Sequence, residues 1–439
     1  MRRLPESFVG ARAGAVPADS REKARPPAAA EKPGVVQQEW PGRELLNSPM
    51  LARVLMAAWS GEAGICVPAC PGSGKSRLIA LLAGALAHRV GLRVLVAAQT
   101  REQASELGRR ITAVSDRAAL IVKSGGQRAG RAVEGVRTVA GHQVRWDRST
   151  GGQILIGTTA RLLYVDPALV GGDILLVDEA WQATYSDVGA LGALARQVVC
   201  VGDPGQVDPV VTGSTARWDG QLSGPHQPAP AALLAAHGDA ISVHRLTNSW
   251  RLGPQTCALV SEHFYPQMPF TSRRPDESVV ASDGTVLPEL ECRRVKTRHG
   301  PTDPALLATL VDRVRELMTF EYRCGGERMA LSEGDIAVAV PHVAQAGAVR
   351  ALLSDLPEVL VGTVNALQGM ERPAVVALHP MAGYRSAEPF ALDAGRMCVT
   401  MTRHRAHLTL CVDSATEAVL ARAGDDSEVV AARGLLTAL

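Results

Sequence analysis

Short uninterrupted runs of apolar residues alternate with longer helix-like stretches along most of the chain after residue 60. Such runs are typical of strands buried on both faces, as in a parallel sheet. The pattern predicts strands at 64–68, 93–98, 118–122, 153–156, 173–177 and 197–201. Strands that alternate with helices favour a doubly wound parallel sheet, which places this part of the chain in the α/β class.

A Gly/Pro-rich break at residues 203–230 interrupts this alternation, which then resumes. The second half has a predicted helix at 343–353 and apolar runs at 335–340, 358–361, 373–377 and 407–412. Two similar α/β lobes joined by a linker explain both halves. We place the lobes at residues 40–235 and 236–439.

Residues 1–39 have a different composition, rich in Ala, Pro, Arg, Lys and Glu and without periodicity. This composition predicts a disordered tail. Its basic residues leave open an electrostatic arm for nucleic acid, but the interleaved acids favour a solvated tail.

The overall composition sets further limits. A chain of 439 residues is long enough for two or three domains, and its net charge of +2 indicates no global attraction to a polyanion, although a local basic groove remains open. The 8 cysteines are scattered without a C-x-x-C pair, and three of them (Cys66, Cys200 and Cys411) lie in apolar runs. We therefore expect buried thiols in a reduced, cytoplasmic protein. No apolar stretch has transmembrane length, so we expect no membrane partner.

Residues 69–76, Ala-Cys-Pro-Gly-Ser-Gly-Lys-Ser, follow the first predicted strand and precede an apolar helix at 78–87. Glycines in such a loop let backbone N–H groups turn onto phosphate oxygens, while the lysine reaches the β- and γ-phosphates and the last serine can ligate Mg²⁺. The helix directs its positive end at the same anion. The residues predicted to hold a nucleoside triphosphate are Gly72, Ser73, Gly74, Lys75 and Ser76. Ala69 replaces the first glycine of the usual pattern, which would be unfavourable if that position needed a positive φ.

The strand predicted at 173–177 ends in Asp178 and Glu179. A carboxylate in the place of Asp178 can hold Mg²⁺ through water, and Glu179 is a candidate general base for the attacking water. The alternative, that both acids only cap the next helix, loses weight beside the phosphate loop.

Four later segments carry polar residues suited to the same chemistry, at 202–206, 248–251, 362–371 and 396–405. The first offers a carboxylate and an amide that could sense the γ-phosphate, and the second an aromatic face beside a guanidinium. The last offers arginines, and an arginine from a facing lobe stabilises charge on a transferred phosphoryl group.

Taken together, these segments resemble the superfamily 1 helicases, especially their B branch, over roughly residues 45 to 412. The blocks that resemble motifs I, Ia, Ic, II, III, IV, the P-[YH]-x-x-Q segment, V and VI are residues 69–76, 100–104, 157–160, 178–182, 202–206, 250–251, 341–345, 363–371 and 402–405. Nine blocks in the family's order are far more specific than any single block. The resemblance implies two RecA-like lobes with the nucleotide site in the cleft between them, and ATP with Mg²⁺ as substrate and metal.

The resemblance also implies individual roles. Lys75, Ser76, Asp178 and Glu179 would act on phosphate, Mg²⁺ and water. In the second group, Gln206 would couple the γ-phosphate to the nucleic-acid site, Arg251 and Arg403 would contact the γ-phosphate, Trp250 would stack on the base, and Glu371 would approach the ribose. The hydroxyls of Thr100, Thr159 and Thr363 would lie on the face that binds single-stranded DNA or RNA, where they would hold phosphates without reading bases.

Two departures from the family pattern change the expectation. Met50 stands where many members carry an adenine-reading Gln, and a thioether cannot pair with the adenine edge, so strict preference for ATP is in doubt. Only residues 120–152 and 265–330 leave room for inserted domains. The first of these is basic, through Arg128, Arg131, Arg137, Arg145 and Arg148, and could contact phosphates or form a solvated loop.

Two function classes therefore remain open. The complete motif set favours an ATP-driven motor that translocates on single-stranded nucleic acid and separates strands. The small inserts favour a nucleic-acid-stimulated ATPase that acts as a switch or clamp in a larger complex. A signalling-type P-loop ATPase would leave the later motifs unexplained.

Overall fold

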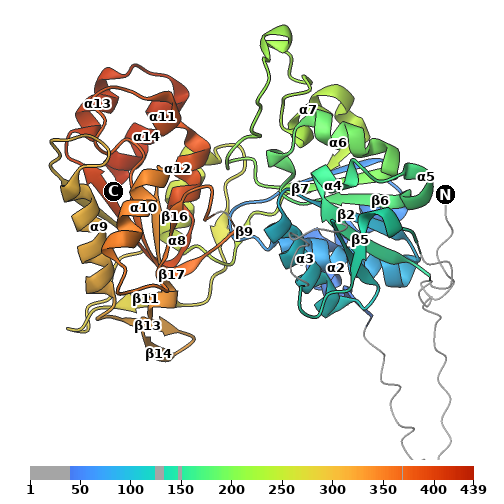
Figure 1. The fold of residues 1–439 in the computed structure, drawn as a ribbon, viewed down its shortest axis with the longest axis horizontal. Coiled ribbons are helices and arrows are strands. Elements are labelled where there is room, and N and C mark those ends of the chain that lie inside the picture. The colour runs from blue at the N-terminus through green and yellow to red at the C-terminus, as the bar shows by residue number, and fades with distance from the viewer. Residues whose placement is uncertain (1–39, 124–132, 147–150, 368) are drawn as a thin grey trace, which may run out of the picture.

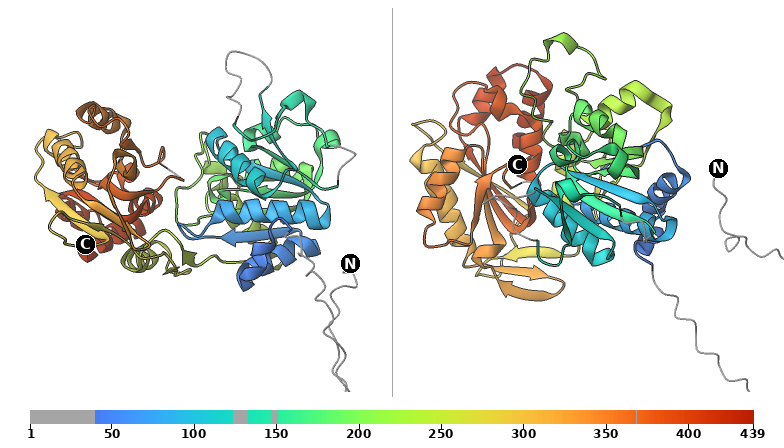
Figure 2. Two further views of the ribbon diagram at one scale, coloured as in Figure 1. Left: turned by 90° about the horizontal axis from the view of Figure 1, so that it is seen from below. Right: turned by 45° about the vertical axis from the view of Figure 1, so that its right-hand side comes forward.

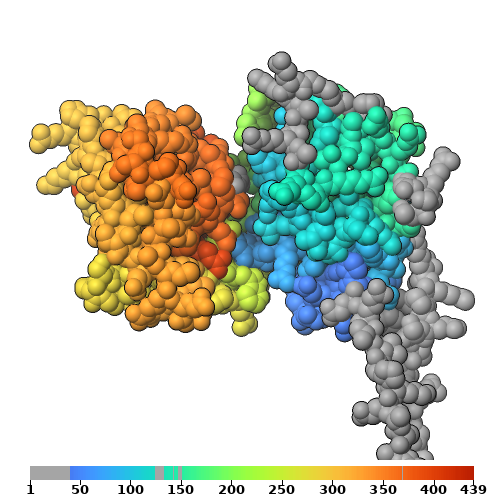
Figure 3. All heavy atoms as spheres, turned by 60° about the horizontal axis from the view of Figure 1, so that its bottom comes forward, coloured from blue at the N-terminus to red at the C-terminus, as the bar shows by residue number. Residues whose placement is uncertain are grey.

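Two α/β lobes lie side by side in the computed structural model, which describes residues 40–123, 133–146, 151–367 and 369–439 (Figure 1). The predicted tail at 1–39 lies outside the described residues, as do Arg128, Arg131 and Arg148 of the basic insert. Two further views show the same division into an N-terminal and a C-terminal lobe (Figure 2). The space-filling view shows a cleft between the lobes (Figure 3).

The N-terminal lobe is built on a parallel sheet with the strand order β4-β3-β5-β2-β6-β7-β1-β8. All six predicted strands of this lobe are confirmed. The strands are β1 (Gly64–Pro68), β2 (Arg93–Ala98), β3 (Ala118–Val122), β4 (Thr138–Ala140), β5 (Gln153–Thr158), β6 (Gly172–Val177), β7 (Ala195–Gly202) and β8 (Ile241–Val243).

Helices cover both faces of this sheet. Successive residues of a strand point to opposite sides, so each strand contributes to a hydrophobic core on both faces. Val94 and Val96 of β2 enter one hydrophobic core, whereas Leu95 and Ala97 enter the other. The helices are α1 (Pro49–Ser60), α2 (Lys75–Ala85), α3 (Arg101–Val114), α4 (Thr159–Leu162), α5 (Pro167–Val170), α6 (Tyr185–Leu191) and α7 (Ala229–His237). This is the doubly wound arrangement that the uninterrupted apolar runs predicted.

The C-terminal lobe repeats the arrangement around a parallel sheet ordered β12-β18-β17-β15-β16. Its strands are β12 (Leu290–Val295), β15 (Ile336–Val340), β16 (Leu360–Thr363), β17 (Arg372–Leu378) and β18 (His404–Asp413). Its helices are α8 (Pro254–Phe264), α9 (Pro304–Leu317), α10 (Val343–Leu352), α11 (Pro389–Leu392), α12 (Ala394–Met401), α13 (Thr416–Arg422) and α14 (Ser427–Ala438). Residues of β15 again alternate between two cores.

Two small sheets accompany this lobe. The first pairs β9 (Asn248–Ser249) with β10 (Thr271–Ser272), and β9 lies between the lobes in Figure 1. The second is antiparallel and consists of β11 (Glu277–Val280), β13 (Glu321–Cys324) and β14 (Glu327–Ala330). Part of the spare length expected at 265–330 therefore forms a small sheet on the side of the lobe.

The Gly/Pro-rich break is not the linker between the lobes. After it, α7 packs against α6, and β8 pairs in parallel with β1. The first sheet therefore extends past the boundary that we placed at residue 235. β8 is only three residues long and has Ser242 at its centre, so it is too short and too polar to recognise in the sequence.

All eight cysteines are free thiols, and Cys66, Cys200 and Cys411 are buried as predicted. Burial raises the pKa of Cys66 and Cys411 to about 12, which keeps these thiols protonated and unreactive. Within the described residues, every helix is too short or too polar to span a bilayer.

Candidate active site

The phosphate loop connects the carboxyl end of β1 to the first residue of α2, Lys75. Gly72 and Gly74 have φ angles of 72° and 86°, in the left-handed region where side chains are unfavourable. Gly72 also has no room for a side chain, since a Cβ there would lie 2.5 Å from Cβ of Arg251. Ala69 has no positive φ, so alanine in place of the first glycine causes no backbone strain. The loop conformation thus agrees with the predicted phosphate site.

Lys75 forms an ion pair with Asp203, which follows β7 on the neighbouring strand. Its Nζ lies 3.3 Å from Oδ2 of Asp203, and its side chain is 10% exposed. Burial disfavours the ammonium, but the carboxylates of Asp203 and Glu179 outweigh it and raise the pKa of Lys75. Lys75 therefore remains charged and keeps an anionic partner at the position where a phosphate is expected.

Asp203 accepts three further hydrogen bonds, one of which comes from the C-terminal lobe. Gln206 Nε2 donates to Oδ2 at 2.9 Å, and the Gly205 backbone N–H donates to Oδ1 at 3.1 Å. The hydroxyl of Tyr265, which follows α8 of the C-terminal lobe, donates to Oδ1 at 2.5 Å. Burial, followed by the charge of Asp203, raises the pKa of Tyr265, so this hydroxyl stays protonated as a donor.

Asp178 and Glu179 follow β6, two strands away from β1 in the sheet. Burial, with the adjacent Glu179 carboxylate, raises the pKa of Asp178 to about 7. Glu179 has a φ of 48°, which makes it the only non-glycine with positive φ among the described residues, and strain of this kind tends to occur at functional positions. Its Oε2 is buried and has no hydrogen-bond partner in the described part of the chain. A buried acceptor without a partner is suited to holding a water molecule.

Arg251 and Arg403 approach the same site from the C-terminal side. Arg251 lies directly beside the phosphate loop, because the backbone N–H of Trp250 donates to the Gly72 carbonyl at 2.9 Å. Arg403 is 3% exposed, donates to the Val399 carbonyl at 3.2 Å, and has no carboxylate ion-pair partner among the residues described. Burial and the nearby charge of Arg251 lower the pKa of Arg403 to about 10. Glu179 and Asp203 act in the opposite direction, so they lie close enough to interact with this guanidinium.

Glu371 lies between two arginines in this structure, Arg251 and Arg405. It is hydrogen-bonded to Arg251 Nε and to Arg405 Nη1, the latter at 2.7 Å. Burial alone would raise the pKa of Glu371, but the charges of Arg251 and Arg405 lower it. The carboxylate therefore positions Arg251, and contact with a nucleotide would require a change in this pairing.

The two residues expected near the base are placed differently from each other. Trp250 is 59% exposed, so it is available for stacking and does not belong to the core. Met50 lies near the start of α1 and packs against the core of the N-terminal lobe. A side chain that packs inward cannot read an adenine edge.

The three threonines predicted to face nucleic acid lie at carboxyl ends of sheet strands. Thr100 caps α3 and accepts from the Gln103 N–H, and Thr363 accepts from the Ala366 N–H. Thr159 is 7% exposed and its hydroxyl donates to the Ala98 carbonyl. In this structure the hydroxyl closes the start of α4 onto β2, and the expected phosphate contact at Thr159 stays a prediction.

The structure brings together Lys75, Asp178, Glu179, Gln206, Arg251 and Arg403 around one site. It adds Asp203, Tyr265 and Arg405, whose contacts the sequence did not reveal. Asp203 lies inside the segment 202–206, whose carboxylate could be recognised in the sequence, but its bonds to Lys75 and Tyr265 could not. Tyr265 lies outside every motif block, so the sequence contains no signal for it.

Comparison with known proteins adds family matches on both lobes. Two protein families, each described as an AAA domain, match residues 52–218 and residues 232–415. The DNA-binding protein SMUBP-2 of Rattus norvegicus is 24% identical over 264 residues, which are 56% of this chain and 25% of that protein. SMUBP-2 of Mus musculus is 23% identical over the same length. The chain thus spans about a quarter of the length of these relatives.

Solved helicase structures show a distant likeness. The PRRSV helicase is 14% identical with a TM-score of 0.42, over 82% of this chain and 54% of that chain. The Arterivirus nonstructural protein 10 (helicase) is 15% identical with a TM-score of 0.44, over 82% of this chain and 62% of that chain.

Proposed function

This chain is a P-loop NTPase of the superfamily 1 helicase type, and on that premise we propose that it hydrolyses ATP to translocate along single-stranded nucleic acid and separate strands. The observation that carries the proposal is the convergence of charged groups from both lobes on the phosphate loop. Lys75 and Glu179 come from the first lobe, and Arg251 and Arg403 come from segments after it. Hydrolysis that needs both lobes can be coupled to their relative movement.

The side chains present fit a nucleoside triphosphate with Mg²⁺. The left-handed glycines open the loop to phosphate oxygens, and the buried, partnerless Oε2 of Glu179 can accept a water proton. Ser76 and Asp178 would hold Mg²⁺, which supplies charge neutralisation at the phosphates. Asp178 must lose its proton to do so.

In the proposed reaction, Lys75 exchanges its Asp203 partner for the phosphates, which releases Asp203 to its bonds with Gln206 and Tyr265. Glu179 orients water and receives its proton. Arg251 and Arg403 stabilise the charge on the transferred group. The Asp203 contact with Tyr265 gives a direct path from the phosphate site to the second lobe.

A second candidate is an ATPase switch or clamp that does not unwind. It is favoured by the small size of the inserts, since residues 133–146 of the first insert contain only the three-residue strand β4 and one short 3₁₀ turn. Helicases that split duplex commonly use larger inserted domains.

The test is the ATPase rate with and without single-stranded DNA and RNA homopolymers, followed by strand displacement on a tailed duplex. The name of the relative SMUBP-2 specifies DNA, so single-stranded DNA is the first polymer to use. Stimulation with strand displacement supports the motor, and stimulation without displacement supports the switch. No stimulation by either polymer would refute both.

A further inference from the structure

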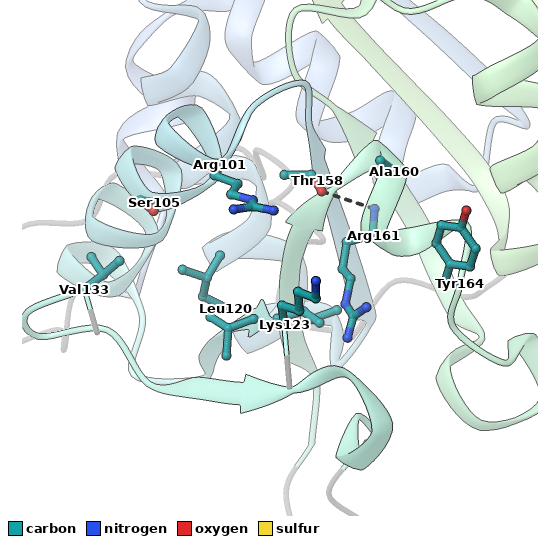
Figure 4. Close-up of a pocket in the computed structure, with 11 residues that line it drawn as sticks. Arg101, Ser105, Leu120, Lys123, Val133, Thr158, Ala160, Arg161 and Tyr164 are labelled. Carbon is teal, nitrogen blue, oxygen red and sulfur yellow. Dashed lines mark hydrogen bonds between the residues drawn. The ribbon is translucent and has the colours of Figure 1, made fainter. Parts of the chain in front are cut away.

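A pocket of about 260 Å³ on the N-terminal lobe is lined by Arg101, Thr158 and Arg161 among other residues (Figure 4). Arg101 follows Thr100 and Thr158 precedes Thr159, so the pocket lies on the face predicted to bind nucleic acid and belongs to the function already proposed. The small antiparallel sheet of β11, β13 and β14 has no part in that function so far (Figure 1). A chain of ion pairs connects this sheet to the phosphate loop.

The chain of ion pairs begins at Glu277 of β11, which lies outside every motif block. Its carboxylate is fully buried and accepts a hydrogen bond from the Tyr322 hydroxyl of β13 at 2.5 Å. Its second partner is Arg405 of β18, whose Nε lies 2.9 Å from the same oxygen and whose Nη2 donates to the other oxygen. A buried ion pair is often no more stabilising than apolar side chains of similar volume, so stability alone does not explain this pair.

Arg405 extends the chain of ion pairs toward the nucleotide site. Its Nη1 donates to Oε1 of Glu371 at 2.7 Å, so all three of its nitrogens donate to the carboxylates of Glu277 and Glu371. The other oxygen of Glu371 accepts from Nε of Arg251. Arg251 also donates through Nη1 to the Thr402 carbonyl at 3.1 Å, and its Cβ lies against the phosphate loop. Four charges of alternating sign therefore lead from the small sheet to this loop.

Glu371 can serve Arg251 only while Arg405 has a second carboxylate. Among the described residues, the ion-pair partners of Arg405 are Glu277 and Glu371. Without the charge of Glu277, Arg405 would attract Glu371 alone and draw it away from Arg251, which would then be held by the Thr402 carbonyl.

We infer that Glu277 is a positioning residue for the hydrolysis of ATP. By holding Arg405, it keeps Glu371 shared between two arginines and so fixes the guanidinium of Arg251 beside the phosphate loop. This inference rests on the proposed function, in which Arg251 stabilises the charge on the transferred phosphoryl group, and it gives the small sheet a part in that function.

The test is the substitution Glu277→Gln in the full chain, which removes the charge with almost no change of shape. It should lower kcat about 10²-fold, the loss typical of a catalytic group misplaced by about 1 Å, and change KM for ATP little. ADP with aluminium fluoride, a mimic of the transferred phosphoryl group, should bind about 10²-fold more weakly, while ADP alone binds as to wild type. In the Arg251→Ala background, Glu277→Gln should cause no further loss of kcat, because the group that it positions is absent.

The matched control is Glu321→Gln, because Glu321 lies on β13 of the same sheet, is half exposed, and pairs only loosely with Arg328 at 3.9 Å. It should leave kcat and both affinities unchanged. The double variant Glu277→Gln with Arg405→Gln leaves no unpaired buried charge, so it tests the same contact if Glu277→Gln alone is unstable in urea, and it should lose kcat to the same extent.

Wild-type kcat in the folded variants, or an equal loss from Glu277→Gln with and without Arg251, would show that Glu277 is structural and would overturn the inference alone. Equal weakening of ADP and of ADP with aluminium fluoride would do the same. Absence of ATPase activity in the wild-type chain would overturn the proposed function itself.

Discussion

Arg403 and Arg313 are both fully buried arginines of the C-terminal lobe, and we predict that replacing them with Met has opposite effects on stability. Arg403 is 3% exposed and has no carboxylate ion-pair partner among the described residues. Arg313 of α9 is 1% exposed and pairs with Glu291, with further bonds to Thr409 and His407. The charge of Arg403 therefore has no compensating carboxylate among the described residues, whereas the charge of Arg313 is compensated by Glu291.

The magnitude follows from the electrostatics of Arg403. A pKa lowered from 12.5 to about 10 means that the charged form is disfavoured in the folded state by about 3 kcal/mol, a cost present at neutral pH where the unfolded chain is also charged. Arg403→Met removes this cost. It also removes the hydrogen bonds to the Val399 carbonyl and the Thr402 hydroxyl, each worth about 1 kcal/mol. The nucleotide-free variant should therefore be about 1 kcal/mol more stable than wild type.

The same change should lower kcat by about 10³, equivalent to about 4 kcal/mol of transition-state stabilisation, if Arg403 contacts the phosphoryl group. Arg313→Met should instead destabilise the fold by about 3 kcal/mol, the low end for a broken buried pair because Glu291 is 26% exposed, and should leave kcat of the folded fraction unchanged. Urea unfolding at pH 7 without nucleotide and steady-state ATPase assays measure both quantities. Equal destabilisation by the two variants, or wild-type turnover in Arg403→Met, would refute the reasoning.

Three further predictions concern the same site. Lys75→Ala should abolish turnover, and Glu179→Gln should retain ATP binding but stall hydrolysis, so Glu179→Gln turning over at the wild-type rate would remove Glu179 from the role of base. Because the pKa of Asp178 is raised to about 7, a proton competes with Mg²⁺ for this carboxylate below that pH. The Mg²⁺ concentration that gives half-maximal ATPase activity should therefore rise several-fold from pH 8 to pH 6. A Mg²⁺ requirement that does not change with pH would contradict this. Met50 packs against the core, and the exposed Trp250 offers a face on which any base can stack, so GTP should be used within about tenfold of ATP. Strict ATP preference in a competition assay of the four NTPs would show that other groups read the adenine.

The central strands of both sheets could be predicted because they are parallel and buried. Both faces of such a strand are covered, so its apolar residues run without interruption and stand out in the sequence. β8 pairs with only one neighbour at the edge of the sheet, and its three residues are only half-buried. β12 is likewise an edge strand, and its exposed and half-buried positions include Glu291 and two arginines. The same physical difference explains why the boundary between the lobes was placed too early.

Some residues of the candidate site could be predicted because the local backbone conformation requires those residue types. Gly72 and Gly74 are required by positive φ, and the acids after β6 by their place at a strand end. The partners of these residues depend on how the lobes pack. Asp203 is bonded to Lys75 and to Tyr265, which lie far apart in the chain, and nothing local to any of the three encodes the contact.

Asp203 also determines what nucleotide binding must overcome. Its ion pair with Lys75 neutralises a buried ammonium that would otherwise be unfavourable, so an incoming phosphate replaces one anion with another and adds no uncompensated charge at Lys75. The net attraction for the nucleotide must then come mainly from groups that lack an anionic partner, the loop N–H groups and Arg403. Affinity for phosphate in this chain therefore depends on the second lobe, whose arginine is stabilised only when the site is filled.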